Sequence, residues 1–219
     1  MKYFALVLMM GTSIAIAANV KKNNYPPEWW KEVPRSDAAS WEVLPQDAKP
    51  GEVILSKRTE LGIFSNFAAT PVEIDGKVYP SIEGFWQMMK YPEGPKDERA
   101  KFPGNEWKYT RDQVAQMVGF EAKRAGDLAD HNMKKMNINW VTYKGKKMSY
   151  RVPEKGDHYR LIRRAMRAKH DQNAEVKRLL KATADLILRP DHDQGTDVPP
   201  AWKYFEIWTE MRAEASRSN

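Results

Sequence analysis

The strongest constraint on the fold is a short segment in which a β-hairpin pattern gives way to a helical pattern. Two apolar runs, residues 70–74 and 77–79, flank Asp75-Gly76, a dipeptide that suits a type I′ hairpin turn. Ser81 then offers a good N-cap for a helix. Apolar side chains recur at helical spacing after it: Ile82, Phe85, Trp86 and Met89. A hairpin followed at once by a helix predicts a mixed fold.

The remaining chain adds several helices and little strand. Residues 52–55 predict a short strand and residues 185–188 a return strand, whereas residues 140–147 predict a loop with a basic run. Helical patterns are found at residues 111–118, 120–129, 157–169, 204–214 and after the capping residue Asn173. We therefore expect an α+β single domain in which a small β-sheet with a β-hairpin is surrounded by several α-helices.

The first residues have the layout of a secretory signal peptide. Lys2 is followed by an apolar run, and Ala15-Ile16-Ala17 places small residues at the −3 and −1 positions of a cleavage site. The run is shorter than the roughly 20 residues that a membrane span requires. We expect residues 1–17 to be removed on export, leaving a periplasmic or secreted protein with no stable membrane association.

Residues 18–50 form a segment rich in proline and tryptophan. It holds five prolines and three tryptophans, and these tryptophans are Trp29, Trp30 and Trp41. Exposed tryptophans are costly, so we expect an irregular N-terminal arm that packs its aromatic rings onto the domain formed by residues 51–215.

The composition excludes several kinds of site. The chain has no cysteine, which rules out disulfides, a thiol nucleophile and a cysteine-based metal site. Its histidines lack zinc-type spacing, and the acidic stretch 191–197 resembles a calcium loop only loosely, without the terminal glutamate. We expect no metal and no cofactor.

The charge favours an anionic partner. The formal net charge is +7, which suits phosphates, nucleotides or nucleic acid. A nucleic acid is one alternative partner. It would bind the basic residues Lys144, Lys146, Lys147, Arg160, Arg163, Arg164 and Arg167. A solvated helix face is the more usual meaning of such a run of basic residues.

The helix after the hairpin carries the most informative polar residues. Glu83, Gln87 and Lys90 lie at i, i+4 and i+7, so they share one face. Glu83 falls in the first turn, where the helix dipole favours the ionised carboxylate. The pattern is compatible with a solvated face and with the wall of a cleft.

A second candidate segment begins at Arg58 and leads into the hairpin. Its residues Phe64, Asn66 and Phe67 offer two aromatic faces and an amide, which suit a planar ligand. The alternative is that both rings fill the core and that Asn66 closes a turn.

Together these segments resemble the NADAR/YbiA-like family. The family shows F-S-N-F, a hairpin and a helix of the type V-E-x-x-[FY]-Q-x-x-K, and this chain has F-S-N-F at 64–67 and I-E-G-F-W-Q-M-M-K at 82–90. Residues 120–126 are similar to its A-K-x-x-G helix, and residues 166–183 to its R-A-K-F-x-Q-N and L-L-x-T block. The resemblance runs from about residue 55 to residue 212, in the family's order. The C-terminal loop and helix, residues 189–212, depart from it.

The resemblance implies a YbiA-like domain that hydrolyses an N-glycosidic bond to ribose. It places Glu83 and Lys90 in catalysis, where Lys90 binds phosphate, supplies a proton or forms an imine. It assigns Phe64, Asn66, Phe67 and Gln87 to the substrate pocket. Further candidates for substrate binding are Arg58 and, as local substitutes in the divergent loop, Asp191 and His192; the alternative for these two is a capped turn. The implied partner is a phosphorylated ribosyl or nucleotide-like small molecule, or an ADP-ribosylated macromolecule. The alternative function is a catalytically inactive module that binds ADP-ribose or a nucleotide.

Overall fold

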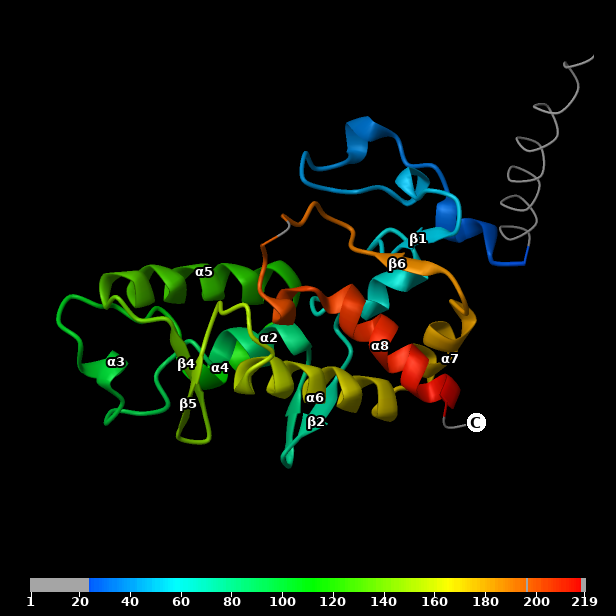
Figure 1. The fold of residues 1–219 in the computed structure, drawn as a ribbon. Helices are drawn as coiled ribbons and strands as arrows, with labels where there is room; N and C mark the ends of the chain where they lie inside the picture. Colours follow the sequence, from blue (N-terminus) through cyan, green and yellow to red (C-terminus); the bar gives the residue numbers. More distant parts are fainter. Residues whose placement is uncertain (1–23, 196, 218–219) are drawn as a thin grey trace, which may run out of the picture.

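The computed structural model describes residues 24–195 and 197–217, so the signal peptide predicted at residues 1–17 lies outside the described residues. Helix α5 (Gly119–Lys135) lies on one side of the domain and α6 (Asp157–Gln172) on the other. The short helices α2 (Ile82–Met88) and α4 (Arg111–Ala115) lie between them (Figure 1). Every residue of α2 is buried, so this helix is the centre of the domain.

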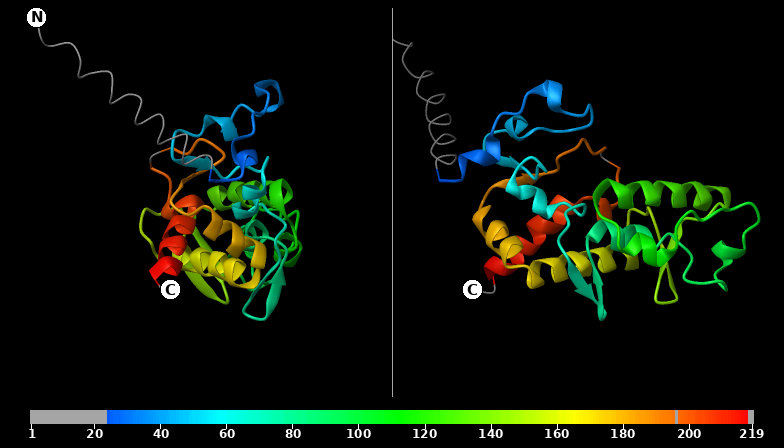
Figure 2. Two further views of the ribbon diagram at one scale, coloured as in Figure 1. Left: turned by 90° about the vertical axis from the view of Figure 1, so that its right-hand side faces the viewer. Right: turned by 180° about the vertical axis from the view of Figure 1, so that it is seen from behind.

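The strands form three separate two-stranded sheets. Strand β1 (Glu52–Ile54) pairs in parallel with β6 (Ile187–Arg189). The pairs β2 (Val72–Ile74) with β3 (Lys77–Tyr79), and β4 (Trp140–Tyr143) with β5 (Lys146–Ser149), are antiparallel. Figure 2 shows the β2–β3 hairpin projecting from the side of the domain opposite the arm. The expected α+β class is confirmed, with its strands divided among three pairs.

The predicted hairpin-to-helix segment forms as expected. Asp75 and Gly76 have φ values of 53° and 79°, the positive angles that a type I′ turn requires at both positions. The Ser81 hydroxyl accepts a hydrogen bond from the backbone N–H of Gly84 at 2.9 Å and donates one to the carbonyl of Met117 at 2.9 Å. The cap of α2 is therefore also a tertiary contact.

The prediction of a loop at residues 140–147 is wrong. These residues form β4, the turn and the first two residues of β5. Lys144 and Gly145 form the turn of this hairpin with φ values of 50° and 75°. The turn was not predicted because lysine is an unusual residue at a positive φ. Lys144-Gly145 stands where the Asn-Gly or Asp-Gly signature of such turns is expected. Val141 and Met148, which face each other across the pair, are buried among the core residues and hold the hairpin there.

The other helices are α3 (Glu98–Lys101), α7 (Ala174–Ala182) and α8 (Tyr204–Arg217). The Asn173 side chain caps α7 as predicted, since its Oδ1 accepts hydrogen bonds from the N–H groups of Glu175 and Val176 at 3.0 Å. Within residues 24–195 and 197–217, no helix combines the length and the apolar character that crossing a bilayer requires.

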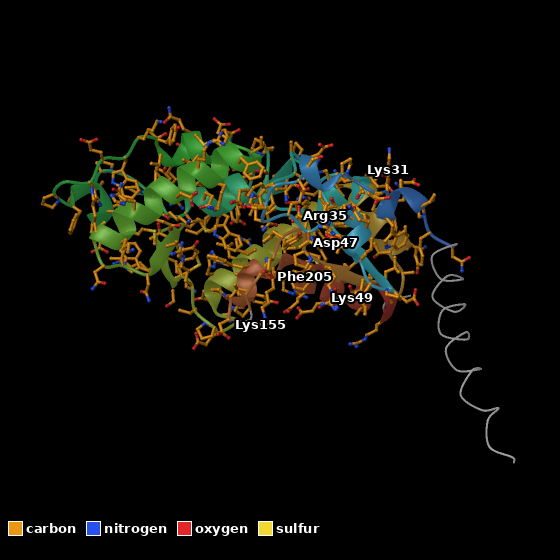
Figure 3. All side chains as sticks on the ribbon, turned by 90° about the horizontal axis from the view of Figure 1, so that it is seen from above. Lys31, Arg35, Asp47, Lys49, Lys155 and Phe205 are labelled. Atoms are coloured by element: carbon orange, nitrogen blue, oxygen red, sulfur yellow. The ribbon has the colours of Figure 1, made fainter. Side chains whose placement is uncertain are left out.

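The described part of the arm, residues 24–50, packs on the domain through two of its tryptophans. Trp29 is fully buried and donates to Glu60 Oε1 at 2.7 Å, and Trp30 donates to the carbonyl of Glu52 at 2.9 Å. An ion pair between Arg35 and Asp47, which lie near each other in Figure 3, closes the arm on itself. Trp41 differs from the other two tryptophans, because it is 46% exposed.

Candidate functional site

The polar stripe of α2 faces inward. Glu83, Gln87 and Lys90 are only 6%, 5% and 2% exposed, so the alternative of a solvated face is excluded. The Gln87 amide donates to Glu83 Oε1 at 2.7 Å. Lys90 Nζ donates to Asp130 Oδ2 at 2.9 Å and lies 3.4 Å from the carbonyl oxygen of Gly126. The stripe therefore packs against one face of α5.

Burial is the largest influence on the pKa of Glu83. Removal from water raises the pKa of its carboxyl above the ordinary value, although the hydrogen bond from Gln87 and the charges of Lys90 and Lys123 act in the opposite direction. The sequence expectation considered only the helix dipole, which favours the ionised carboxylate, whereas burial shifts the pKa of Glu83 in the opposite direction. Burial outweighs the dipole because the carboxyl lies in the core of the domain.

The segment around Asn66 holds the N-terminal end of α2. The carbonyl of Asn66 accepts a hydrogen bond from the backbone N–H of Glu83 at 2.8 Å. Phe64 is fully buried against Trp208, with ring centroids 5.2 Å apart, so it fills the core as the alternative interpretation expected. Phe67 is only partly buried. Phe64, which was predicted to bind substrate, is therefore a core residue, whereas Asn66 contacts Glu83 through its backbone.

Three buried polar atoms around α2 lack a hydrogen-bond partner among the described residues. They are Asn66 Oδ1, Gln87 Oε1 and Trp86 Nε1. Buried polar groups in folded proteins are nearly always paired, so an unpaired buried acceptor is a candidate contact for a partner that the protein itself does not supply. Asn66 and Gln87 both contact Glu83, so their two acceptors suit a polar ligand beside its carboxyl, whereas Trp86 packs on His158 with ring centroids 4.9 Å apart.

Lys169 is a buried cation near this site that the sequence did not single out. It is 1% exposed, and its Nζ donates to the carbonyl of Ser65 at 2.9 Å, next to Asn66. Burial lowers its pKa to about 7. Two signals were available: Lys169 is the lysine of the R-A-K block, and in α6 it continues the apolar spacing of Ile162, Ala165 and Met166.

Asp191 and His192 belong to a second polar cluster. Asp191 forms an ion pair with Lys57, a hydrogen bond to His192 Nδ1 at 3.0 Å and one from the Tyr204 hydroxyl at 3.2 Å. Burial alone would raise the pKa of Asp191, but the His192 hydrogen bond and the Lys57 charge lower it. Lys57 was not predicted, since nothing local in the sequence links it to a residue 134 positions away.

Arg58 contacts the arm. Its guanidinium makes two 2.8 Å hydrogen bonds to the carboxylate of Glu42 and one of 2.6 Å to the carbonyl of Asp37. These contacts occupy the group that was predicted to bind substrate. The structure does not bring Arg58 together with Glu83 or Lys90 through any contact in the described residues.

A groove with a volume of about 720 Å³ runs beside the C-terminal half of α5. Its lining includes Asp130, Tyr150 and Arg151. Lys90 Nζ binds Asp130 and lies 5.3 Å from the centre of the Tyr150 ring, and Arg151 pairs with the same carboxylate at 2.6 Å. The groove therefore reaches the Lys90 end of the stripe.

The basic residues considered for nucleic-acid binding all contact carboxylates. Arg164 and Lys144 pair with Asp75, and Arg163 and Arg167 with Glu214. The remaining three are paired in the same way: Lys146 and Arg160 with Asp157, and Lys147 with Glu98. Among the residues that the structure describes, no group of His, Asp or Glu side chains is arranged to hold a metal ion.

Comparison with known proteins places this site in context. No model of a known protein family matches the chain. The chain is 30% identical over 129 residues to "N-glycosidase YbiA" of Escherichia coli (strain K12), which covers 59% of this chain and 62% of that protein. The protein of the same name in Shigella boydii serotype 4 (strain Sb227) matches to the same extent. The chain thus matches less than two thirds of the length of these relatives.

A solved structure gives a weaker likeness. The NMR structure of the E. coli protein YbiA has a TM-score of 0.47 and 24% sequence identity to this chain. It covers 75% of this chain and 86% of that one. The resemblance to the YbiA-like family seen in the sequence motifs is confirmed by the sequence relatives.

Proposed function

The chain resembles the YbiA-like family, and on that premise we propose that it is a hydrolase that cleaves an N-glycosidic bond to ribose. The substrate is a phosphorylated, nucleotide-like molecule or an ADP-ribosylated macromolecule. The observation that carries the proposal is the buried stripe of Glu83, Gln87 and Lys90 with the unpaired acceptors of Asn66 and Gln87, two residues that contact Glu83. The name of the relatives supports the reaction class.

Glu83 is the residue to which we assign the hydrolytic step. As the C–N bond breaks, positive charge develops on the ribose, and a fixed carboxylate stabilises it. A water adds to the anomeric carbon, its proton passes to Glu83, and the nitrogen leaves with the bonding electron pair and then takes up a proton. Burial moves the pKa of Glu83 towards neutral pH, where acid–base catalysis is most efficient. Gln87 holds one carboxylate oxygen and leaves the other for the water.

Lys90 has a supporting role in this proposal. Its Nζ forms an ion pair with Asp130 at 2.9 Å and lies 3.4 Å from the Gly126 carbonyl oxygen. We assign it to charge stabilisation and to orienting anionic parts of the substrate at the groove. Borohydride trapping of a covalent adduct during turnover would show an imine instead.

The test is an assay against ADP-ribose adducts, NAD and ribosylated pyrimidine or purine amines. Turnover that is lost in Glu83→Gln, in a variant that melts at the wild-type temperature, would support the hydrolase. The acid limb of the pH profile of kcat/KM should lie above the ordinary glutamate range and should be absent in Glu83→Gln. Saturable binding without turnover would identify the inactive ADP-ribose or nucleotide-binding module.

We also propose that the protein acts after export, in the periplasm or outside the cell. The proposal depends on the signal-peptide pattern in residues 1–17. Fractionation of cells that express the full chain tests it, and retention of the uncleaved protein in the cytosol would contradict it.

A further inference from the structure

Three aromatic side chains from separate parts of the chain meet at the surface. Trp41 from the arm and Phe120 at the start of α5 are 46% and 49% exposed, and their ring centroids are 6.0 Å apart. Phe67 packs edge-on against Phe120 at 5.1 Å. We call Trp41, Phe67 and Phe120 the aromatic platform. Exposed large apolar side chains that lie together often mark a binding site, so the joint exposure of Trp41 and Phe120 calls for an explanation.

The arm is fixed where it delivers Trp41. Glu42 forms an isolated antiparallel bridge with His192 and the 2.8 Å ion pair with Arg58. The backbone N–H of Val43 donates to the carbonyl of Asp191 at 3.0 Å. Trp41 is thus held by its neighbours in the chain and is not the end of a fraying segment. These contacts also explain why Arg58, Asp191 and His192 lie together.

A cation lies beside the platform. Lys57 Nζ is 5.3 Å from the centre of the Phe67 ring and 6.0 Å from that of Trp41, and its ammonium group is paired with Asp191. The Lys57 side chain keeps 31% exposure. Aromatic faces next to a lysine form the combination with which proteins bind a nucleotide, because the rings stack on the base and the cation attracts the phosphate.

Helix α5 connects the platform to the catalytic stripe. Phe120, Lys123, Asp127 and Asp130 are spaced three or four residues apart and share one helix face. The positive charge of Lys123 acts to lower the pKa of Glu83, and the carboxylate of Asp130 accepts a hydrogen bond from Lys90. At a rise of about 1.5 Å per residue, Phe120 lies only about 5 Å along the axis from Lys123 and about 15 Å from Asp130. The platform therefore flanks the Glu83 end of the stripe, one residue from Asn66.

We propose that Trp41, Phe67 and Phe120 form a stacking subsite for the planar heterocyclic base of a nucleotide substrate, and that the N-terminal arm is therefore part of the active site. The inference rests on the proposed function, because it places the base at the platform, the scissile bond near Glu83 and the anionic groups towards Lys57 and the Lys90 groove. Stacking tolerates different bases, so the subsite selects for a base without reading its identity.

The test compares two probes that differ only in the base, AMP and ribose 5-phosphate. Their dissociation constants are measured by calorimetry on the full chain and on the variants Trp41→Ala, Trp41→Phe and Phe120→Ala. A matched control is Phe102→Ala, because Phe102 is also an exposed aromatic, at 37%, and follows α3 at the opposite end of the domain from the arm (Figure 1). Thermal melts establish that each variant is folded.

We expect AMP to bind more tightly than ribose 5-phosphate. Trp41→Ala and Phe120→Ala should weaken the binding of AMP by about 5- to 150-fold, the range that loss of one base–aromatic stack produces. Both should leave ribose 5-phosphate within about twofold, Trp41→Phe should restore most of the AMP affinity, and Phe102→Ala should have no effect. Equal affinities for the two probes in the wild type, an unchanged AMP affinity in folded Trp41→Ala, or no binding of either probe would overturn the inference.

The assay of turnover is separate from this one. Base-dependent binding that is lost in Trp41→Ala, without turnover of any N-glycoside, would retain the platform and refute the hydrolase. Turnover with no dependence on Trp41 or Phe120 would retain the hydrolase and refute the platform.

Discussion

The packing of Gly126 against Gln87 predicts that a single methyl group would disable the candidate site. A Cβ atom at Gly126 would lie 1.8 Å from Gln87 Oε1 and 2.3 Å from its Cδ, far inside contact distance. The amide must therefore move in Gly126→Ala. Gln87 is buried, and its movement breaks the 2.7 Å hydrogen bond to Glu83.

The magnitude follows from two opposing effects. Loss of a hydrogen bond to a charged group costs about 1.5–3 kcal/mol. Replacing glycine by alanine in the interior of α5 stabilises the helix by about 1 kcal/mol. We therefore expect Gly126→Ala to lower the free energy of unfolding by only about 0.5–2 kcal/mol. The activity should fall further, by about 100-fold, because a catalytic group displaced by about 1 Å loses that much.

Urea denaturation followed by far-ultraviolet circular dichroism measures the first quantity, and turnover of an N-glycoside measures the second. The double variant Gly126→Ala/Gln87→Ala is the control, because it removes the clashing side chain. It should recover stability relative to Gly126→Ala but not activity. A Gly126→Ala protein that is as active as the wild type would refute the assignment of Gln87 to holding Glu83.

Three further outcomes follow from individual contacts. Lys169 has a pKa of about 7 in the folded chain and an ordinary value near 10.4 in the unfolded chain. The unfolded chain binds the extra proton between these two pH values, so the contribution of Lys169 makes the free energy of unfolding rise with pH there. Lys169→Met should remove on the order of 3 kcal/mol of that rise, measured by denaturation at pH 6 and pH 9.5. Asn173→Ala removes two N-cap hydrogen bonds from α7 and should cost about 1 kcal/mol of unfolding free energy, whereas Asn173→Asp should cost less. Arg58→Ala removes the ion pair that holds Glu42, so limited proteolysis should cut the arm faster than in the wild type, and an unchanged rate would contradict the assigned role.

Predictions based on local backbone chemistry were confirmed. The turn at Asp75-Gly76, the cap at Ser81 and the cap at Asn173 each depend on residues within a few positions of one another, so the sequence contains the whole interaction. The β4–β5 hairpin was missed for the same reason, since its turn residue Lys144 carries no local signal and its strands depend on burial of Val141 and Met148.

The sequence by itself determined the α+β class, the hairpin-to-helix segment and the alignment of Glu83, Gln87 and Lys90 on one helix face. Only the tertiary structure decided that this face is buried against α5 and that burial raises the pKa of Glu83. It also brought Lys57 to Asp191 and Trp41 to Phe120. The physical reason is that helical periodicity and turn chemistry act over a few residues, whereas desolvation and side-chain contact depend on which distant segments pack together.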